Sequence, residues 1–148
     1  MNHNLYLSGS LFTRDYLSDA IQSEPEYALV NVDEIGKTLR GIFESFPTER
    51  TPSEAQTEDD LIWPVLAALG WDHVLRQQNL APVGRDNVPD GLLFSNSEAK
   101  SLADTHVEDW KRYNHGVVVV ESKRWDRPLD RGQRKKDEAS APSTQMLR

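Results

Sequence analysis

Four consecutive valines, Val117 to Val120, constrain the fold of this chain more than any other segment. β-branched side chains favour extended backbone, and a run that is apolar on both faces is typical of a strand covered on both sides. We therefore expect this run to form the centre of a β-sheet. Helices are predicted before it, over 13–22, over 32–45 and up to about residue 69, so the expected fold class is α/β, with helices flanking the sheet.

The helix that ends near residue 69 has a stop signal and an ambiguous start. Gly70 would end it, because glycine adopts the left-handed backbone of a helix C-terminus. Thr51 with Glu54 has the pattern of a capping box, whereas Thr57 could cap a later start. Pro64 lacks the N–H that an interior helix position donates, so we expect a kink or a first turn near 57–60.

Two further strands are predicted between this helix and the valine run, over 73–80 and 88–94. Residues 95–114 are polar and would form an inserted excursion that could hold a short helix. This insertion leaves 30 residues between Asp90 and Glu121. Since a plain hairpin needs far fewer, the pairing of 88–94 with the valine run is a hypothesis for the structure to test.

Composition excludes several classes of protein. The chain of 148 residues has no cysteine, which rules out a disulfide framework, a thiolate zinc site and a cysteine nucleophile. It has neither an apolar run of the roughly 20 residues that cross a membrane nor a signal-peptide pattern at its start, so we expect a cytoplasmic protein. The net charge is −7, yet residues 111–136 hold 9 Lys and Arg against 3 Asp and Glu. That basic segment could contact phosphate or form a solvated face.

Charged residues follow the valine run directly. Side chains alternate along a strand, so Glu121 and Lys123 should share one face and Ser122 should point away. If the predicted strands pair, Asp90 can lie beside Glu121, and two carboxylates with an open side suit Mg²⁺. A lysine there can orient a water and neutralise charge on phosphorus, which suits phosphodiester hydrolysis. The alternative is a turn role for Asp90 and an exposed ion pair at a strand end.

These residues match a known signature. Pro89-Asp90, followed by Glu121-Ser122-Lys123, resembles the PD-(D/E)xK nuclease motif. The segment from Ser53 to Trp71 resembles the helix that opens the nuclease domain of type I and type IIG restriction enzymes. Near the end of the sequence, Gln145 resembles the first position of a Gln-x-x-x-Tyr motif, and the sequence stops one residue before the tyrosine. The resemblance covers about residues 53–148.

The resemblance implies a restriction-endonuclease-like fold, with a mixed central sheet flanked by helices. Residues 51–148 would form the nuclease-like domain of a longer polypeptide, and residues 1–50 a helical extension packed on that core. Asp90 and Glu121 would bind Mg²⁺, with Mn²⁺ as an alternative, and Lys123 would position the attacking water. A helix acid would assist, and Glu54 matches it by its distance to Gly70-Trp71, with the capping-box role as its alternative. Glu58 is the substitute if the helix starts later, and Gln145 would lie near the phosphate or the lysine.

The implied partners are double-stranded DNA and downstream methyltransferase and specificity modules, and a homodimer stays open. Arg124, Arg127 and Arg131 are candidates for contacting DNA phosphate. The implied activity is that of a metal-dependent DNA endonuclease in a restriction–modification system. One alternative is a catalytically inactive nuclease fold that binds DNA or protein. Another is an unrelated α/β interaction domain in which the motif arises by chance.

Overall fold

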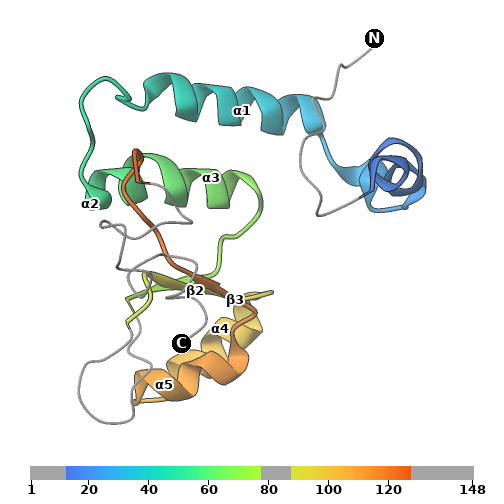
Figure 1. Cartoon of the computed structure of the whole chain (residues 1–148). Coiled ribbons are helices and arrows are strands. Elements are labelled where there is room, and N and C mark those ends of the chain that lie inside the picture. Colours follow the sequence, from blue (N-terminus) through green and yellow to red (C-terminus); the bar gives the residue numbers. More distant parts are fainter. Residues whose placement is uncertain (1–12, 78–87, 128–148) are drawn as a thin grey trace. The chain divides into compact units, whose positions relative to one another are not determined.

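The computed structural model describes residues 13–77 and 88–127 (Figure 1). The chain divides into two compact units, residues 1–37 and 38–148. Predictions that fall on the remaining residues, Gln145 and Arg131 among them, lie outside the described part. None of the helices in that part combines the length and apolar character needed to cross a bilayer.

The first unit is helical. A π-helical turn, η1 (Tyr16–Ala20), runs into a 3₁₀ turn, η2 (Ile21–Ser23), and a second 3₁₀ turn, η3 (Tyr27–Leu29), follows. Helix α1 (Val32–Ser45) then continues into the second unit. Its bounds are those predicted from the spacing of its apolar residues, and Asn31 caps it by accepting the Glu34 N–H at 3.2 Å.

The helical segment of residues 54–68 opens the sheet-containing part. It comprises α2 (Glu54–Thr57), the π turn η4 (Glu58–Ile62) and α3 (Trp63–Ala68). Both predicted starts are wrong, because Ser53 is the N-cap and forms a capping box with Gln56. The Ser53 N–H donates to the Gln56 side-chain oxygen at 3.0 Å, and the Gln56 N–H donates to the Ser53 hydroxyl at 3.1 Å.

Pro64 and Gly70 have the local effects expected of them. The wider turn η4 immediately precedes α3, which has Pro64 in its first turn, and the Trp63 N–H reaches back five residues to the Glu58 carbonyl. Gly70 has a φ of 91°. The Gly70 N–H bonds to the Ala67 carbonyl at 2.9 Å and the Trp71 N–H to the Leu66 carbonyl at 3.0 Å, which is the Schellman pattern of a helix end.

Three antiparallel strands form the sheet, in the order β1 (Val74–Arg76), β2 (Gly91–Leu93) and β3 (Val118–Val120). The predicted pairing of the valine run with residues 88–94 is present, with Gly91 opposite Val120. The predicted central position of the valines is wrong for the described sheet. All three residues of β2 are buried, whereas Val118 is 36% exposed on the edge strand.

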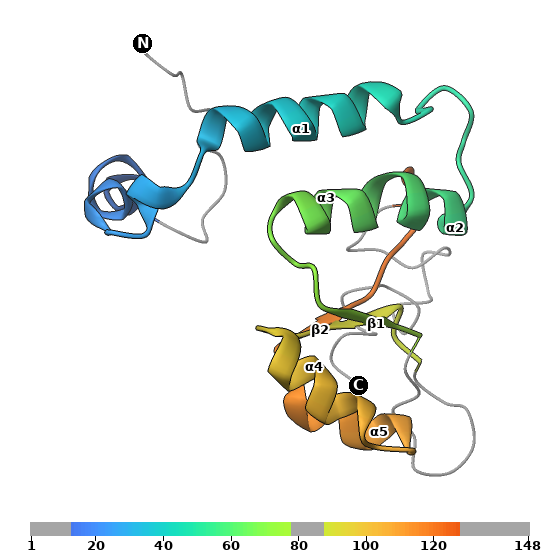
Figure 2. The same ribbon diagram turned by 180° about the vertical axis from the view of Figure 1, so that it is seen from behind.

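The insertion between β2 and β3 helps to bury β2. It contains α4 (Ser97–Asp104), α5 (Asp109–Arg112) and the 3₁₀ turn η5 (Tyr113–His115). Helices α4 and α5 lie on one face of the sheet, and the helical segment 54–68 lies on the other (Figures 1 and 2). The structure is therefore a mixed α/β fold in which β2 is covered on both faces.

Candidate functional site

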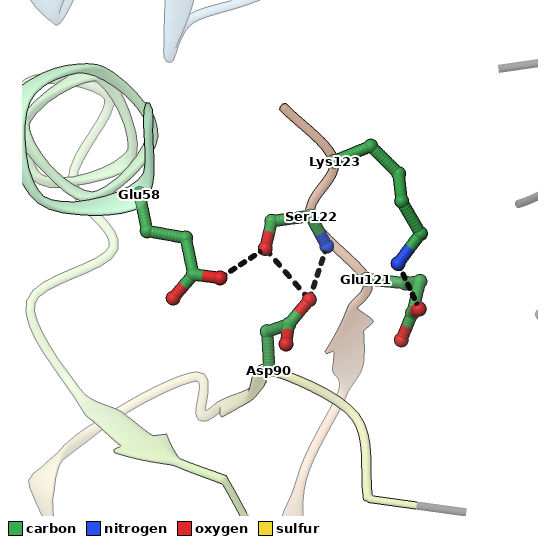
Figure 3. Close-up of polar contacts among 5 residues, drawn as sticks. All are labelled: Glu58, Asp90, Glu121, Ser122 and Lys123. Atoms are coloured by element: carbon green, nitrogen blue, oxygen red, sulfur yellow. Dashed lines mark hydrogen bonds and ion pairs between the residues drawn. The ribbon is translucent and has the colours of Figure 1, made fainter. Parts of the chain in front are cut away.

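The two halves of the predicted motif meet at one end of the sheet. Asp90 precedes β2, and Glu121, Ser122 and Lys123 follow β3. The Oδ2 atom of Asp90 accepts hydrogen bonds from the Ser122 backbone N–H at 2.5 Å and from the Ser122 hydroxyl at 2.6 Å. Residues 32 positions apart are thus joined directly (Figure 3).

Glu58 completes this contact from the helical segment. Its Oε1 atom lies 2.6 Å from the hydroxyl oxygen of Ser122, which is almost fully buried at 2% exposed. That hydroxyl has one hydrogen and two carboxylate neighbours, so it can donate to only one of them at a time. We call Glu58, Asp90 and Ser122 the acid junction. It concentrates negative charge that a proton or a cation would neutralise.

The two candidate helix acids, Glu54 and Glu58, lie in different environments. Glu54 is exposed in the first turn of α2, whereas Glu58 begins the π turn and reaches Ser122. The sequence contains a signal for this, because Glu58 shares the apolar helix face of Leu61 and Val65 by its spacing. An acid on a buried face needs a polar partner, and Ser122 supplies it here.

Glu121 and Lys123 form an ion pair with each other. The two side chains share one side of the chain, and the Ser122 side chain points away toward Asp90 and Glu58 (Figure 3), in line with the expected alternation. The register that sets Gly91 opposite Val120 brings Asp90 to the start of the motif segment, and the two carboxylates have different hydrogen-bond partners there. Asp90 is bonded to Ser122, because the Ser122 backbone and hydroxyl together offer two donors, and Glu121 is bonded to Lys123.

The acid junction and Glu121 together offer a set of oxygen ligands to a divalent cation. Its groups are carboxylate and hydroxyl oxygens, which are the ligands that Mg²⁺ prefers. Within residues 13–77 and 88–127, however, no three acidic or histidine side chains are grouped so that they could hold a metal ion together. The residues therefore fit the cation by chemistry, and the Glu121 carboxylate is already ion-paired with Lys123.

Buried neighbours fix the segment that follows the motif. The Trp125 N–H donates to the Thr57 hydroxyl at 3.2 Å, and Thr57 is 2% exposed. The Trp125 ring meets the edge of Phe46, with ring centroids 5.4 Å apart. These contacts attach the chain just beyond Lys123 to α2 and to Phe46, the residue that follows α1.

The described arginines of the basic segment are in different environments. Arg124, a predicted phosphate contact, is exposed and forms an ion pair with Asp126 at 2.6 Å. Asp126 therefore already neutralises the Arg124 guanidinium. Arg127 is half-buried, at the turn closed by its N–H and the Arg124 carbonyl at 2.9 Å. A phosphate contact through Arg124 would therefore displace Asp126.

Ionisable groups of the insertion have altered environments of their own. Burial raises the pKa of the Tyr113 hydroxyl far above its ordinary value, and the charge of Asp109 adds to this. The hydrogen bond from Lys111 lowers the pKa of Glu108. The Nε2 atoms of His106 and His115 lie 3.0 Å apart and share a hydrogen bond. These groups belong to α4, α5 and their flanking turns rather than to the acid junction.

The chain was compared with protein-family models, curated proteins and solved structures, and none of them matched it.

Proposed function

We propose that this chain is a nuclease domain of the PD-(D/E)xK type, with a restriction-endonuclease-like fold, that hydrolyses DNA phosphodiester bonds with a divalent cation. Its proposed setting is the cleavage module of a restriction–modification system in the cytoplasm. The observation that carries the proposal is the bond from the Asp90 carboxylate to Ser122, the middle residue of Glu121-Ser122-Lys123. It brings an isolated acid and an acid–lysine motif to one place.

The roles follow from what each side chain can do. Asp90 and Glu121 would hold the cation, and Glu58 would add a third carboxylate through its contact with Ser122. Mg²⁺ or Mn²⁺ would supply Lewis-acid chemistry when bound. The Lys123 ammonium, with three donors and a positive charge, would orient the attacking water and stabilise charge that develops on the phosphate. Double-stranded DNA is the proposed substrate, with Arg124 beside its backbone.

A second candidate function is DNA or protein binding without cleavage. It is favoured by the absence of a three-acid cluster among the described residues and by the engagement of Glu121 with Lys123. Methyltransferase and specificity modules, and a second copy of the chain, stay proposed partners under both functions.

A nicking assay on supercoiled plasmid, with Mg²⁺ or Mn²⁺, distinguishes the two candidates. We expect Asp90→Asn, Glu121→Gln and Lys123→Ala each to lower the nicking rate by at least about a hundredfold, since each removes a group from the reacting centre. Lys100→Ala is the matched control, because Lys100 lies outside the basic segment and forms an ion pair with Asp104 on α4, and it should cleave like the wild type.

The outcomes separate as follows. Equal rates for the wild type and Lys123→Ala would remove Lys123 from the mechanism. Full activity of both acid variants would overturn the nuclease assignment. A wild-type chain that binds duplex DNA without nicking it would favour the second candidate. Circular dichroism of each variant shows whether its fold is intact.

A further inference from the structure

Lys123 is a largely buried cation beside the proposed cation site. Its side chain is 8% exposed, and that of its partner Glu121 is 16% exposed. Among the described residues, Glu121 is the recorded polar partner of the Lys123 ammonium. A buried ammonium without a counter-charge is costly, so this ion pair fixes where the Lys123 side chain lies.

The charge is divided unevenly between the two parts of the site. Glu121 and Lys123 neutralise each other, whereas Glu58 and Asp90 share a single hydroxyl hydrogen from Ser122. The acid junction thus attracts a cation, and Glu121 is already occupied by one. The recorded contact of the ammonium is with the Oε1 atom of Glu121, so a dication that takes this carboxylate as a ligand shares it with the ammonium. The two positive charges repel each other, which weakens the hold of each on Glu121.

We propose that Lys123 and the divalent cation compete for the Glu121 carboxylate, so that Lys123 acts as the counter-ion of the site until the cation replaces it. This inference rests on the proposed function and adds a form of regulation to it. Cation binding releases the ammonium from Glu121 and frees it to face the phosphate and the water.

The test is the affinity of the 148-residue chain for Mn²⁺ and Mg²⁺, measured by titration calorimetry. Lys123→Met keeps most of the side-chain length and removes the charge. We expect it to bind Mn²⁺ about tenfold more tightly than the wild type, although it cleaves no DNA. Lys123→Gln, which can still donate a hydrogen bond to Glu121, should change affinity in the same direction. Lys111→Met is the matched control and should bind like the wild type.

Thermal unfolding gives a second measurement that does not depend on activity. Without cation, Lys123→Met should melt below the wild type, because Glu121 loses its counter-charge. Saturating Mg²⁺ should then raise its melting temperature by more than it raises that of the wild type.

The results that overturn this inference differ from those that overturn the nuclease proposal. Should the lysine variants bind Mn²⁺ no more tightly than a wild type that does bind it, the competition is refuted and the nuclease proposal stands. Should wild type and variants all fail to bind either cation, there is no cation site at Glu121, and both are refuted.

Discussion

β2 separates two surfaces that are both buried and chemically different. On the side of the insertion, Leu92 and Phe94 pack with Ala103 into an apolar cluster. On the side of the helical segment 54–68, the Trp63 ring lies directly over Gly91. Asp90, one of the two carboxylates of the acid junction, directly precedes Gly91. One strand therefore supports a hydrophobic core on one face and the approach to a charged site on the other.

The two sides have opposite relations to stability. Burial of apolar surface stabilises a fold without requiring any particular partner. Two half-buried carboxylates around one hydroxyl depend on particular partners, because Asp90 accepts the Ser122 N–H whereas Glu58 shares the single hydroxyl hydrogen with Asp90. The proposed activity therefore lies at the acid junction, whose groups have specific polar chemistry, and not in the apolar core.

The largest effect should come from the apolar side. Phe94→Ala removes a ring that is 2% exposed, and we expect it to lower the free energy of unfolding by about 3–5 kcal/mol. Urea denaturation measures this. Val107→Ala, at a residue 88% exposed in the same insertion, should stay within about 0.5 kcal/mol of the wild type. Similar losses for both would mean that the insertion does not form the core.

The contact between Trp63 and Gly91 should be the next most sensitive. A Cβ atom at position 91 would overlap the indole ring, so Gly91→Ala should cost about 1–3 kcal/mol. Gly41→Ala is the opposite case, because a Cβ atom in α1 meets nothing within 4 Å. It should stabilise the chain by about 0.5–1 kcal/mol. Thermal unfolding of the pair tests the sign, and a neutral Gly91→Ala would contradict the close packing.

Glu58→Gln tests whether the acid junction serves stability. The amide can donate to the Ser122 oxygen, which frees the hydroxyl hydrogen for Asp90. We expect a gain of about 1 kcal/mol in cation-free buffer, together with slower nicking. Urea denaturation with and without Mg²⁺ measures the first effect. If Glu58→Gln instead destabilises the cation-free chain, the two sides of β2 do not differ as described.

The smallest effect concerns Tyr113, which packs against the apolar cluster. Its pKa is raised by burial, so the unfolded chain releases this proton first, from about pH 10 upward. Stability from this group is complete below that pH and is lost as the pH rises through the raised pKa. Tyr113→Phe should therefore show a shallower fall in melting temperature between about pH 9 and 11 than the wild type. Parallel falls would refute the assignment.

Local rules were sufficient for much of the fold. The spacing of apolar residues gave the bounds of α1, and Gly70 marked the end of the helical segment 54–68. Pro64 predicted a disturbance in that segment, and the structure has the π turn η4 beside it. These features depend on neighbours within one or two turns of the chain, so the amino-acid order alone carries them.

Other features depend on residues that are far apart. The sequence predicts the valine run as the buried central strand. In the structure the buried strand is β2, because the insertion covers one of its faces and the helical segment 54–68 covers the other. Likewise, a strand pattern places Glu121 and Lys123 on one face, yet it does not say which acid meets Ser122.

The sequence by itself determined which side chains could do the chemistry: a carboxylate before one strand and a carboxylate with a lysine after another. Only the tertiary structure decided that Ser122 joins Asp90 and Glu58, over separations of 32 and 64 residues. The physical reason is that contacts so distant in the chain are fixed by how helices and strands pack. Packing depends on the burial of whole faces rather than on any local pattern.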